Sequence, residues 1–271
     1  MTIHGKCKKI RLDVLLVERG LFETREKAKR SIMAGLVFSG TERLEKAGEK
    51  VKSDIDLHVK GQLMPYVGRG GFKMEKALQV FDFDVAGKTG LDIGSSTGGF
   101  TDCSLQNGAA HMYALDVGSN QLDWKLRSDD RVTVMEKTNF RHATPDMFPV
   151  APQFATIDVS FISLRLMLPP LKTILVEGGD VMALVKPQFE AGRDDIGKKG
   201  IVRDERIHVR VLDEMVEFFI QQGFYVKQLD YSPITGGEGN IEFLLHARLG
   251  QPGLDPSVHA TETVKQAHAS L

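Results

Sequence analysis

The sequence is poor in cysteine and tryptophan, and it has no long uninterrupted apolar run. Its 271 residues include two cysteines and one tryptophan. Cys7 and Cys103 lie far apart without metal-ligand spacing, so we expect neither a disulfide framework nor a metal site. Residues such as Arg165, Pro169 and Lys172 interrupt the longest apolar stretches, so none reaches the ~20 residues of a membrane span.

The beginning of the chain also lacks the pattern of a secretion signal. The basic opening MTIHGKCKKIRLD is not followed by an apolar segment, so we expect no signal peptide. Together with the sparse cysteines, this predicts a cytoplasmic protein without a membrane partner.

The charges are unevenly distributed along the chain, although the net charge is only −1. Residues 1–60 contain 14 Lys and Arg against 9 Asp and Glu, whereas the remainder contains 21 against 27. A basic module attracts polyanions because each neutralised phosphate releases condensed counterions. Charge alone favours an ordinary solvated surface over a polyanion site, so the local sequence pattern has to decide between these two interpretations.

That pattern predicts two short helices followed by β-prone segments. The apolar face of the first predicted helix begins at Ile10, and that helix ends at Gly20. A second helix begins after the N-cap candidate Thr24 and ends at Gly35. The segments LVFSG and EKVKSDIDLHV then alternate as strands do. We therefore expect a helix–turn–helix packed on a small strand pair, with its basic side chains on the second helix.

Residues 9–60 resemble the S4 RNA-binding domain. The resemblance is carried by Arg11-Leu12-Asp13, the helix from Arg25 to Ala28, and Gly35-Leu36-Val37. It implies a small α+β fold that presents a basic face to the RNA backbone. The RNA-binding candidates are Arg11, Arg25, Lys29 and Arg30. The alternative is that these charges only solubilise a helix.

Breaker residues suggest the domain boundaries. The run KGQLMP predicts a linker over residues 61–66, between an S4-type domain at 1–60 and a catalytic domain at 67–250. Residues 251–271 lose apolar periodicity after two prolines, which predicts a loose tail or a short terminal helix.

From residue 88 onward, strand-like apolar runs alternate with helical patterns. The strand candidates are GKTGLDIG, HMYALDVG, RVTVME, FATIDVSF, DVMALVKP, FYVKQLDYSPI and NIEFLLHARL. The clearest helix begins near Glu205, and Gly223 ends it. Repeated β–α units that finish in a strand pair predict an α/β, doubly wound sheet with an antiparallel last strand.

The loop after the first of these strands predicts a cofactor site. Ligands bind at the carboxyl ends of the strands in such sheets. The loop Asp92–Phe100 is rich in glycine, and Asp116 ends the next strand, where an acidic residue can accept hydrogen bonds from ribose. The loop lacks the G-x-G-x-x-G of pyrophosphate binders, so S-adenosylmethionine fits it better than a dinucleotide. A structural turn is the plainer alternative.

Four ionisable residues are expected near that edge of the sheet. Lys73 lies in a helix, Asp158 and Lys186 end strands, and Glu242 lies in the final strand pair. Unpaired charges at the ends of apolar strands are costly to bury. A structural salt bridge explains any one of them, whereas four around one pocket favour chemistry.

This Lys-Asp-Lys-Glu set resembles that of FtsJ-type ribose 2′-O-methyltransferases, and the whole chain resembles the TlyA family, also labelled hemolysin A. The runs that carry the resemblance are YVGRGGFK, LDIGSSTGGFTDC, EKTNFR, TIDVSFISL, LVKPQFEAGRDDIGKKGIVRD and GGEGNIEF. The resemblance implies a seven-stranded Rossmann-like methyltransferase that uses S-adenosylmethionine. It implies ribosomal RNA, free or in ribosomal subunits, as partner and a cytidine ribose as target.

The resemblance also suggests a role for each of these residues. We expect Lys186 to activate the 2′-hydroxyl, Asp158 to hold Lys186 beside the methyl group, and Lys73 and Glu242 to position the ribose. The cofactor candidates are Asp92, Gly94, Ser95, Gly98, Gly99, Phe100, Asp116, Asn139 and Asp158, and Arg69 joins the RNA-binding set.

Three rival functions remain open, and the oligomeric state, monomer or homodimer, is open too. A nicotinamide-dependent oxidoreductase shares the fold class, but the glycine spacing is wrong for it. An RNA-binding or ribosome-assembly factor without catalysis has no need of the four ionisable residues. A membrane-active hemolysin is the least supported, because the sequence offers no pore-forming or spanning segment.

Overall fold

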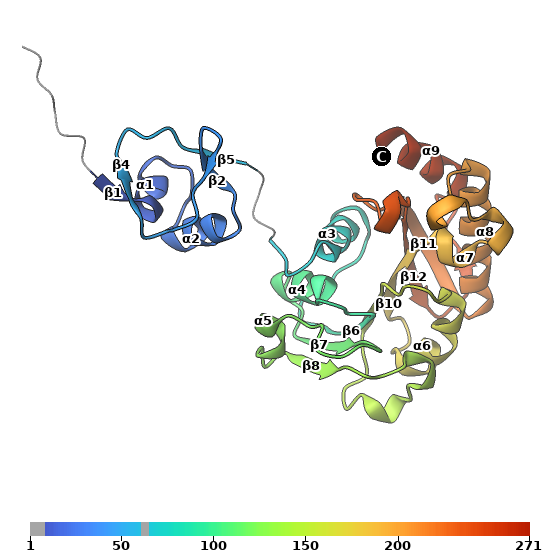
Figure 1. Cartoon of the computed structure of the whole chain (residues 1–271). Helices are drawn as coiled ribbons and strands as arrows, with labels where there is room; N and C mark the ends of the chain where they lie inside the picture. The colour runs from blue at the N-terminus through green and yellow to red at the C-terminus, as the bar shows by residue number, and fades with distance from the viewer. Residues whose placement is uncertain (1–8, 61–64) are drawn as a thin grey trace, which may run out of the picture. The chain divides into compact units, whose positions relative to one another are not determined.

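The computed structural model describes residues 9–60 and 65–271, which belong to two compact units, Met1–Pro65 and Tyr66–Leu271 (Figure 1). Residues 61–64 of the expected linker lie outside the described residues.

Unit 1 consists of two short helices and two small sheets. Its elements are β1 (Lys9–Arg11), α1 (Leu12–Glu18), α2 (Arg25–Met33), β2 (Val37–Ser39), β3 (Glu42–Arg43), β4 (Lys50–Lys52) and β5 (His58–Val59). Strand β1 pairs with β4, and β2 pairs with both β3 and β5. The two helices pack over a core of nine buried residues that includes Leu12, Leu16 and Ile32.

The helix ends of unit 1 confirm the local sequence signals. The Thr24 hydroxyl accepts a hydrogen bond from the Lys27 amide at 3.2 Å, as an N-cap does. Gly20 and Gly35 have φ of 69° and 71°, which glycine adopts without strain. The expected strand pair is present, since β2 pairs with β5, but β3 extends it. The prediction that Ile10 belongs to the first helix is wrong, because Ile10 lies in β1 and pairs with Val51 in β4.

Unit 2 is built on one eight-stranded sheet in the order β13-β11-β12-β10-β9-β6-β7-β8. Its strands are β6 (Thr89–Ile93), β7 (His111–Leu115), β8 (Val132–Met135), β9 (Phe154–Ile157), β10 (Asp180–Val185), β11 (Phe224–Tyr231), β12 (Phe243–Leu249) and β13 (Gly253–Leu254). Strands β8, β7, β6, β9 and β10 are parallel, and β12 runs antiparallel to both β10 and β11.

This topology confirms the predicted doubly wound sheet and adds one feature to it. Seven strands were expected, and the two-residue strand β13 is an eighth, which pairs in parallel with β11 at the edge. Such a short strand carries no periodicity, so the sequence pattern could not indicate it.

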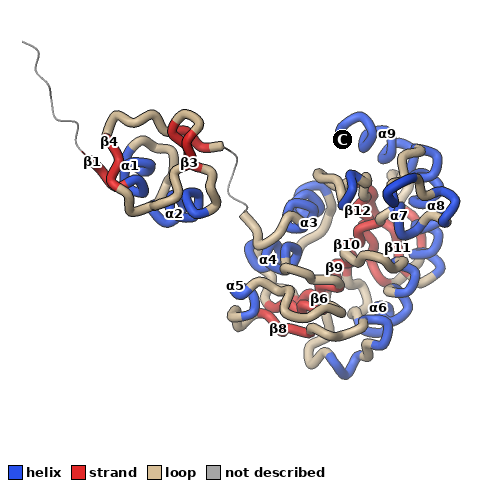
Figure 2. Tube along the Cα trace, viewed as in Figure 1, coloured by secondary structure: helices blue, strands red, loops and turns tan. Residues whose placement is uncertain are grey.

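Helices cover both faces of the sheet (Figure 2). The α-helices are α3 (Gly70–Val80), α4 (Gly99–Gln106), α5 (Trp124–Arg127), α6 (Leu168–Ile174), α7 (Pro187–Glu190), α8 (Glu205–Gln221) and α9 (Ala260–Ser270). Short 3₁₀ turns η1 to η6 are Phe140–His142, Pro145–Met147, Leu164–Leu166, Arg193–Asp195, Lys198–Gly200 and Gly237–Gly239. Two hydrophobic clusters fill the two interfaces, one beneath α3 and α4 and the other beneath α6, α8 and α9.

The C-terminal segment contributes to the second of these clusters. Helix α9 lies within residues 251–271, for which a loose tail and a short helix were both open, and it packs on α8. Its residues Ala260, Val264 and Ala267 are buried against that helix layer.

Within residues 9–60 and 65–271, no helix combines the length and the apolar character needed to cross a bilayer.

We predict that Leu16→Ala destabilises unit 1 alone. Leu16 is fully buried in that small core, and removing a buried leucine side chain costs ~2–5 kcal/mol. Differential scanning calorimetry should show a lowered transition for unit 1 and an unchanged one for unit 2. Leu21→Ala is the matched control because Leu21 is 37% exposed. Equal shifts of both transitions would show that the units unfold together.

Candidate active site

Two lysines and two carboxylates from four distant segments form one ionic cluster, which we call the tetrad. The Lys73 ammonium lies 2.6 Å from Glu242 Oε2 and 3.8 Å from Asp158 Oδ2. The Lys186 ammonium lies 2.5 Å from Asp158 Oδ1 and donates to Ser160 Oγ at 3.0 Å. Asp158 therefore bridges the two lysines, and the four charges balance.

The register of the sheet explains why these residues meet. Asp158 directly follows β9 and Lys186 directly follows β10, so both lie at the carboxyl edge of parallel strands. Strand β12 runs the opposite way, and Phe243 at its beginning is paired with Val185 at the end of β10. Glu242 therefore reaches the same edge from the other direction.

Burial differs within the tetrad. The side chains of Lys73, Lys186 and Glu242 are 9%, 8% and 3% exposed, whereas that of Asp158 is 20% exposed. Charges that are so far removed from water are stable only when they are paired. The open side of the tetrad is at Asp158.

Three cavities meet at Asp158 and Ser160. The first, of about 540 Å³, contains the whole tetrad and we call it the tetrad cavity. The second, about 210 Å³, lies over the glycine loop after β6, and the third, about 330 Å³, lies over the ends of β6 and β7. Lys186 lines the first and the second, so its ammonium stands at the boundary between them.

The glycine loop needs its glycines because other backbone comes close. Gly94 has φ of 82°, and a Cβ there would lie 2.4 Å from the Asp158 carbonyl oxygen. Gly98, with φ of 98°, precedes α4, and a Cβ on Gly99 would lie 2.7 Å from the Gly71 amide nitrogen. Gly94 and Gly99 both line the second cavity, as do Ser95 and Phe100, whereas Gly98 does not.

Asp92 lies beneath this loop, and its carboxylate is engaged by the protein. Its oxygens accept hydrogen bonds from the Thr101 amide and hydroxyl, at 3.1 and 2.7 Å, and from the Thr156 hydroxyl at 3.1 Å. Burial raises the pKa of Asp92 to about 6, against the lowering effect of these bonds. Asp92 thus ties the loop and α4 to β9 at the floor of the second cavity.

Asp116 and Asn139 line the third cavity. The Asp116 carboxylate accepts hydrogen bonds from the amides of Ser96, at 2.8 Å, and Gly118, at 2.7 Å. Each carboxylate oxygen can accept a second bond, so Asp116 retains capacity for a ligand. Asn139 Oδ1 accepts from the Arg141 amide at 3.1 Å and caps η1.

The structure adds an aromatic pair that the sequence reasoning did not identify. Phe161 has φ of 63°, is 90% exposed, and its ring centroid lies 5.2 Å from that of Phe189. Both line the tetrad cavity, and Phe161 also lines the third cavity. The partly buried carboxylate of Glu190 holds this loop, because it accepts hydrogen bonds from the Ser163 hydroxyl and the Leu164 amide. The only sequence signal was a phenylalanine soon after a strand, which is indistinguishable from a core residue.

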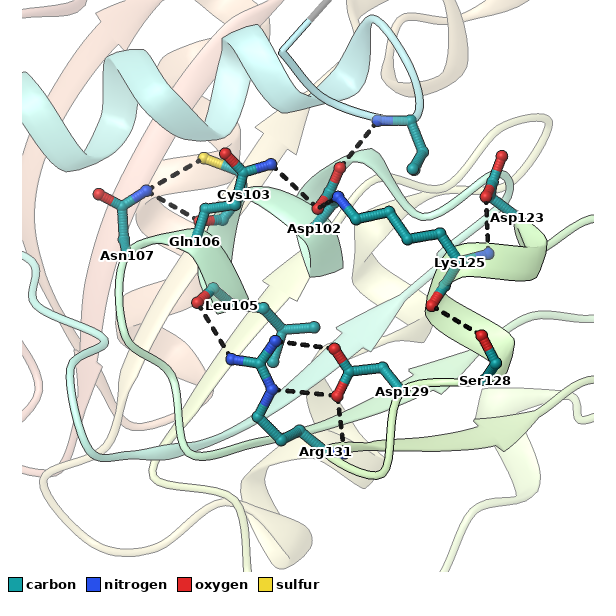
Figure 3. A network of polar contacts seen from close by, with 11 residues as sticks. Asp102, Cys103, Leu105, Gln106, Asn107, Asp123, Lys125, Ser128, Asp129 and Arg131 are labelled. Carbon is teal, nitrogen blue, oxygen red and sulfur yellow. Dashed lines mark hydrogen bonds and ion pairs between the residues drawn. The ribbon is translucent and has the colours of Figure 1, made fainter. Parts of the chain in front are cut away.

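Arg69 is the N-cap residue of α3 and lines the tetrad cavity. The segment before it is anchored to α4, because the Val67 amide donates to Asp102 Oδ2 at 2.9 Å. Figure 3 shows that Asp102 also receives the Lys125 ammonium, at 2.8 Å, and the Gln106 amide. The buried Asp102 carboxylate thus fixes the backbone two residues before Arg69.

The four RNA-binding candidates of unit 1 differ in whether their basic groups are paired with a carboxylate of the protein. The guanidinium groups of Arg11 and Arg25 both donate to the fully buried carboxylate of Asp13. The Arg11 bond in particular lowers the pKa of Asp13 to about 2. Lys29 pairs with Glu26 at 2.8 Å, whereas exposed Arg30 makes no ion pair with the described residues.

Comparison with known protein families decides which family this arrangement belongs to. The family described as FtsJ-like methyltransferase matches residues 66–249, and the S4 domain matches residues 10–54. The chain belongs to the FtsJ-like methyltransferase family. The matched ranges contain all four members of the tetrad and both helices of unit 1.

Relatives of this methyltransferase share nearly the whole chain. It is 62% identical over 269 residues to "Putative rRNA methyltransferase YqxC" of Bacillus subtilis (strain 168), covering 97% of this chain and 96% of that one. It is 37% identical over 260 residues to the 16S/23S rRNA (cytidine-2′-O)-methyltransferase TlyA of Mycobacterium tuberculosis (strain ATCC 25618 / H37Rv), covering 93% and 97%. A solved structure, "Putative hemolysin from Streptococcus thermophilus", has a TM-score of 0.77 and 55% identity, with 98% of each chain covered.

We predict that the free energy of unfolding of unit 2 falls less steeply with rising pH in Asp92→Asn than in the wild-type protein. The folded pKa of about 6 exceeds the ordinary 3.8, so the contribution of Asp92 is full below pH 4 and is lost as pH rises through 6. One pKa unit corresponds to about 1.4 kcal/mol. Asparagine keeps the shape without the buried charge: its oxygen can accept both Thr101 bonds, and its NH2 group can donate to the Thr156 hydroxyl. Calorimetry at pH 5 and pH 8 measures the difference.

The matched control for this prediction is Asp146→Asn, which alters an exposed carboxyl group in η2. It should leave the pH slope of the wild-type protein unchanged. An identical slope in Asp92→Asn would contradict the raised pKa.

Proposed function

We propose that the protein methylates the 2′-hydroxyl of a cytidine ribose in ribosomal RNA and uses S-adenosylmethionine as the methyl donor. The observation that carries this proposal is the tetrad itself, in which Asp158 lines all three cavities and Lys186 lines both the tetrad cavity and the second cavity, over the glycine loop.

The second and third cavities fit the two ends of the cofactor. The Ser95 hydroxyl, beside the second cavity, is buried without a hydrogen-bond partner among the described residues. Asp92 and Asp158 place negative charge around that cavity, which suits a positive sulfonium and ammonium group. The third cavity offers the Asp116 carboxylate for ribose hydroxyls and apolar walls from Leu115 and Ile162. Bound S-adenosylmethionine would supply an electrophilic methyl group.

The tetrad cavity then receives the nucleotide that is modified. Lys186 would orient the 2′-hydroxyl and, as the free amine, accept its proton. Asp158 Oδ1 lies 2.5 Å from Lys186 Nζ, so it would stabilise the ammonium that forms when the Lys186 amine takes this proton. The Lys73–Glu242 pair, at 2.6 Å, keeps the opposite wall in place. Holding the hydroxyl in one orientation is itself a large part of the catalytic effect.

Positive groups at two places support RNA as the substrate. Arg69 and Lys199 are exposed side chains that line the tetrad cavity, where they can contact phosphate. Unit 1 matches the S4 domain, and we infer that it anchors folded RNA mainly through its exposed Arg30. The cytidine preference is inferred from the relative named as a cytidine-2′-O-methyltransferase.

The first test of the proposal is transfer of a radiolabelled methyl group from S-adenosylmethionine to ribosomal RNA or isolated subunits. We expect label on a ribose 2′-oxygen with the wild-type protein and a loss of roughly 10²–10⁴-fold in kcat with Lys186→Ala. The control is Lys172→Ala, which removes an exposed lysine on α6 and should leave kcat unchanged.

The same experiment separates the proposal from a binding-only role. Lys186→Ala should keep its RNA affinity while it loses methyl transfer. If the wild-type protein binds the cofactor and RNA but transfers no methyl group to RNA or to either subunit, the proposed reaction is wrong.

A second prediction concerns unit 1. Arg30→Ala should weaken RNA binding and reduce the slope of log K against log salt by about 1, because one phosphate contact is lost. Lys265→Ala, which removes a like charge from an exposed position on α9, should leave the slope unchanged. Filter binding between 50 and 200 mM salt measures both; equal slopes for the two variants would exclude a phosphate contact at Arg30.

A further inference from the structure

Two loops that carry no tetrad residue form one wall of the tetrad cavity. The first contributes Ile196, Lys199 and Gly200, and the second contributes residues 234–238. Neither loop lines the second or the third cavity. Lys199, with φ of 65°, stands at the tip of the first loop, so the position of its charge depends on how that loop is held.

The side chain of Asn240 joins the two loops. Its amide nitrogen donates to the Gly200 carbonyl at 3.0 Å in the first loop and to the Gly237 carbonyl at 3.3 Å in the second. Its Oδ1 accepts from the Val202 amide at 3.1 Å. Asn240 is only 3% exposed, so these bonds compete little with water.

His208, on α8, binds the carbonyl group of Val202, whose amide group binds Asn240. Its Nε2 lies 3.1 Å from the Val202 carbonyl oxygen, and a carbonyl only accepts, so Nε2 carries the proton. Its Nδ1 then accepts from His268 Nε2, on α9, at 2.9 Å. Burial, followed by the neighbouring His268, lowers the pKa of His208 to about 4, which keeps this tautomer neutral. The chain of contacts thus runs from α9 through α8 to both loops.

The second loop also touches the tetrad. A Cβ on Gly236 would lie 2.1 Å from Glu242 Oε1, so the loop backbone packs directly on that carboxylate. A loosened wall therefore changes both the position of Lys199 and the space beside Glu242, while the glycine loop and Asp116 are left as they are.

We propose that His208 is a positioning residue for the RNA substrate, which holds the two loops through Val202 and Asn240 as a single wall of the tetrad cavity. His268 supports it from the C-terminal helix. The inference rests on the proposed function for the identity of the ligand. Because the wall is absent from the cavities assigned to the cofactor, loss of His208 should affect RNA and not the cofactor.

The test compares His208→Leu, which removes both hydrogen bonds, with His208→Gln, whose amide can donate to Val202 and accept from His268. We expect His208→Leu to raise KM for ribosomal RNA about tenfold or more, with a much smaller change in kcat, since misplaced binding groups act on substrate binding. The dissociation constant of S-adenosylmethionine should stay unchanged. His208→Gln should recover most of the RNA affinity, which a purely space-filling role of His208 does not predict.

A second readout does not depend on activity. Trypsin should cleave within residues 193–203 faster in His208→Leu than in the wild-type protein, and Asn240→Ala should reproduce this effect without altering α8 or α9. The two substitutions should be less than additive because they interrupt one network. The matched control is His259→Ala, an exposed histidine at the beginning of α9, which should change neither readout.

The outcomes distinguish this inference from the proposed function. An absence of methyl transfer by the wild-type protein contradicts the proposed function, and the cleavage rates still test the wall. Unchanged cleavage in both His208→Leu and Asn240→Ala, or a parallel loss of cofactor and RNA affinity, would overturn the positioning role of His208.

Discussion

The site depends on the mutual neutralisation of two ammonium groups and two carboxylates at one edge of the sheet. Lys73, Lys186 and Glu242 are almost fully withdrawn from water, and removal of any partner would leave a buried charge uncompensated. Only Asp158 keeps some exposure, and it touches both lysines. The cluster is therefore stable as a whole and open at one point, which is where the three cavities meet.

The backbone of two neighbouring loops packs directly against the tetrad. Gly94 lies against the Asp158 carbonyl, and Gly236 lies against the Glu242 carboxylate. A side chain at either glycine would not fit. Beneath the loop, Asp92 binds Thr101 and Thr156 and joins α4 to β9. The chemical groups are thus held by rigid strand ends and by backbone packed directly against them.

The two units divide the work that the proposed function requires. Unit 1 carries the excess of positive charge, yet Arg11 and Arg25 are engaged with Asp13 and help to hold the unit's own fold. Of the four RNA-binding candidates, Arg30 is the one that makes no ion pair with the described residues, and the proposed function assigns the polyanion contact to it. Unit 2 supplies Arg69 and Lys199 at the tetrad cavity, where a phosphate next to the modified ribose would lie.

The sequence by itself determined the elements and the chemical groups. Periodicity predicted the alternating strands and helices, and glycines and Thr24 marked helix ends. Charged residues in a helix and on apolar strands near the cofactor edge pointed to Lys73, Asp158, Lys186 and Glu242. These signals are local, because backbone preferences and the cost of burying charge act over a few residues. Their local character is also why the two-residue strand β13 escaped notice and Ile10 was assigned to a helix.

Tertiary structure alone decided how those groups face one another. The antiparallel insertion of β12 beside β10 brings Glu242 to the edge where Lys186 lies. Packing turned the Asp92 carboxylate beneath the loop and left Phe161 exposed over the cavity. The hydrogen bond between His208 and His268 connects residues 60 apart, and that between Val202 and Asn240 connects residues 38 apart. Such pairings depend on long-range registry and on which side of a strand or helix faces the core, and no short stretch of sequence specifies either.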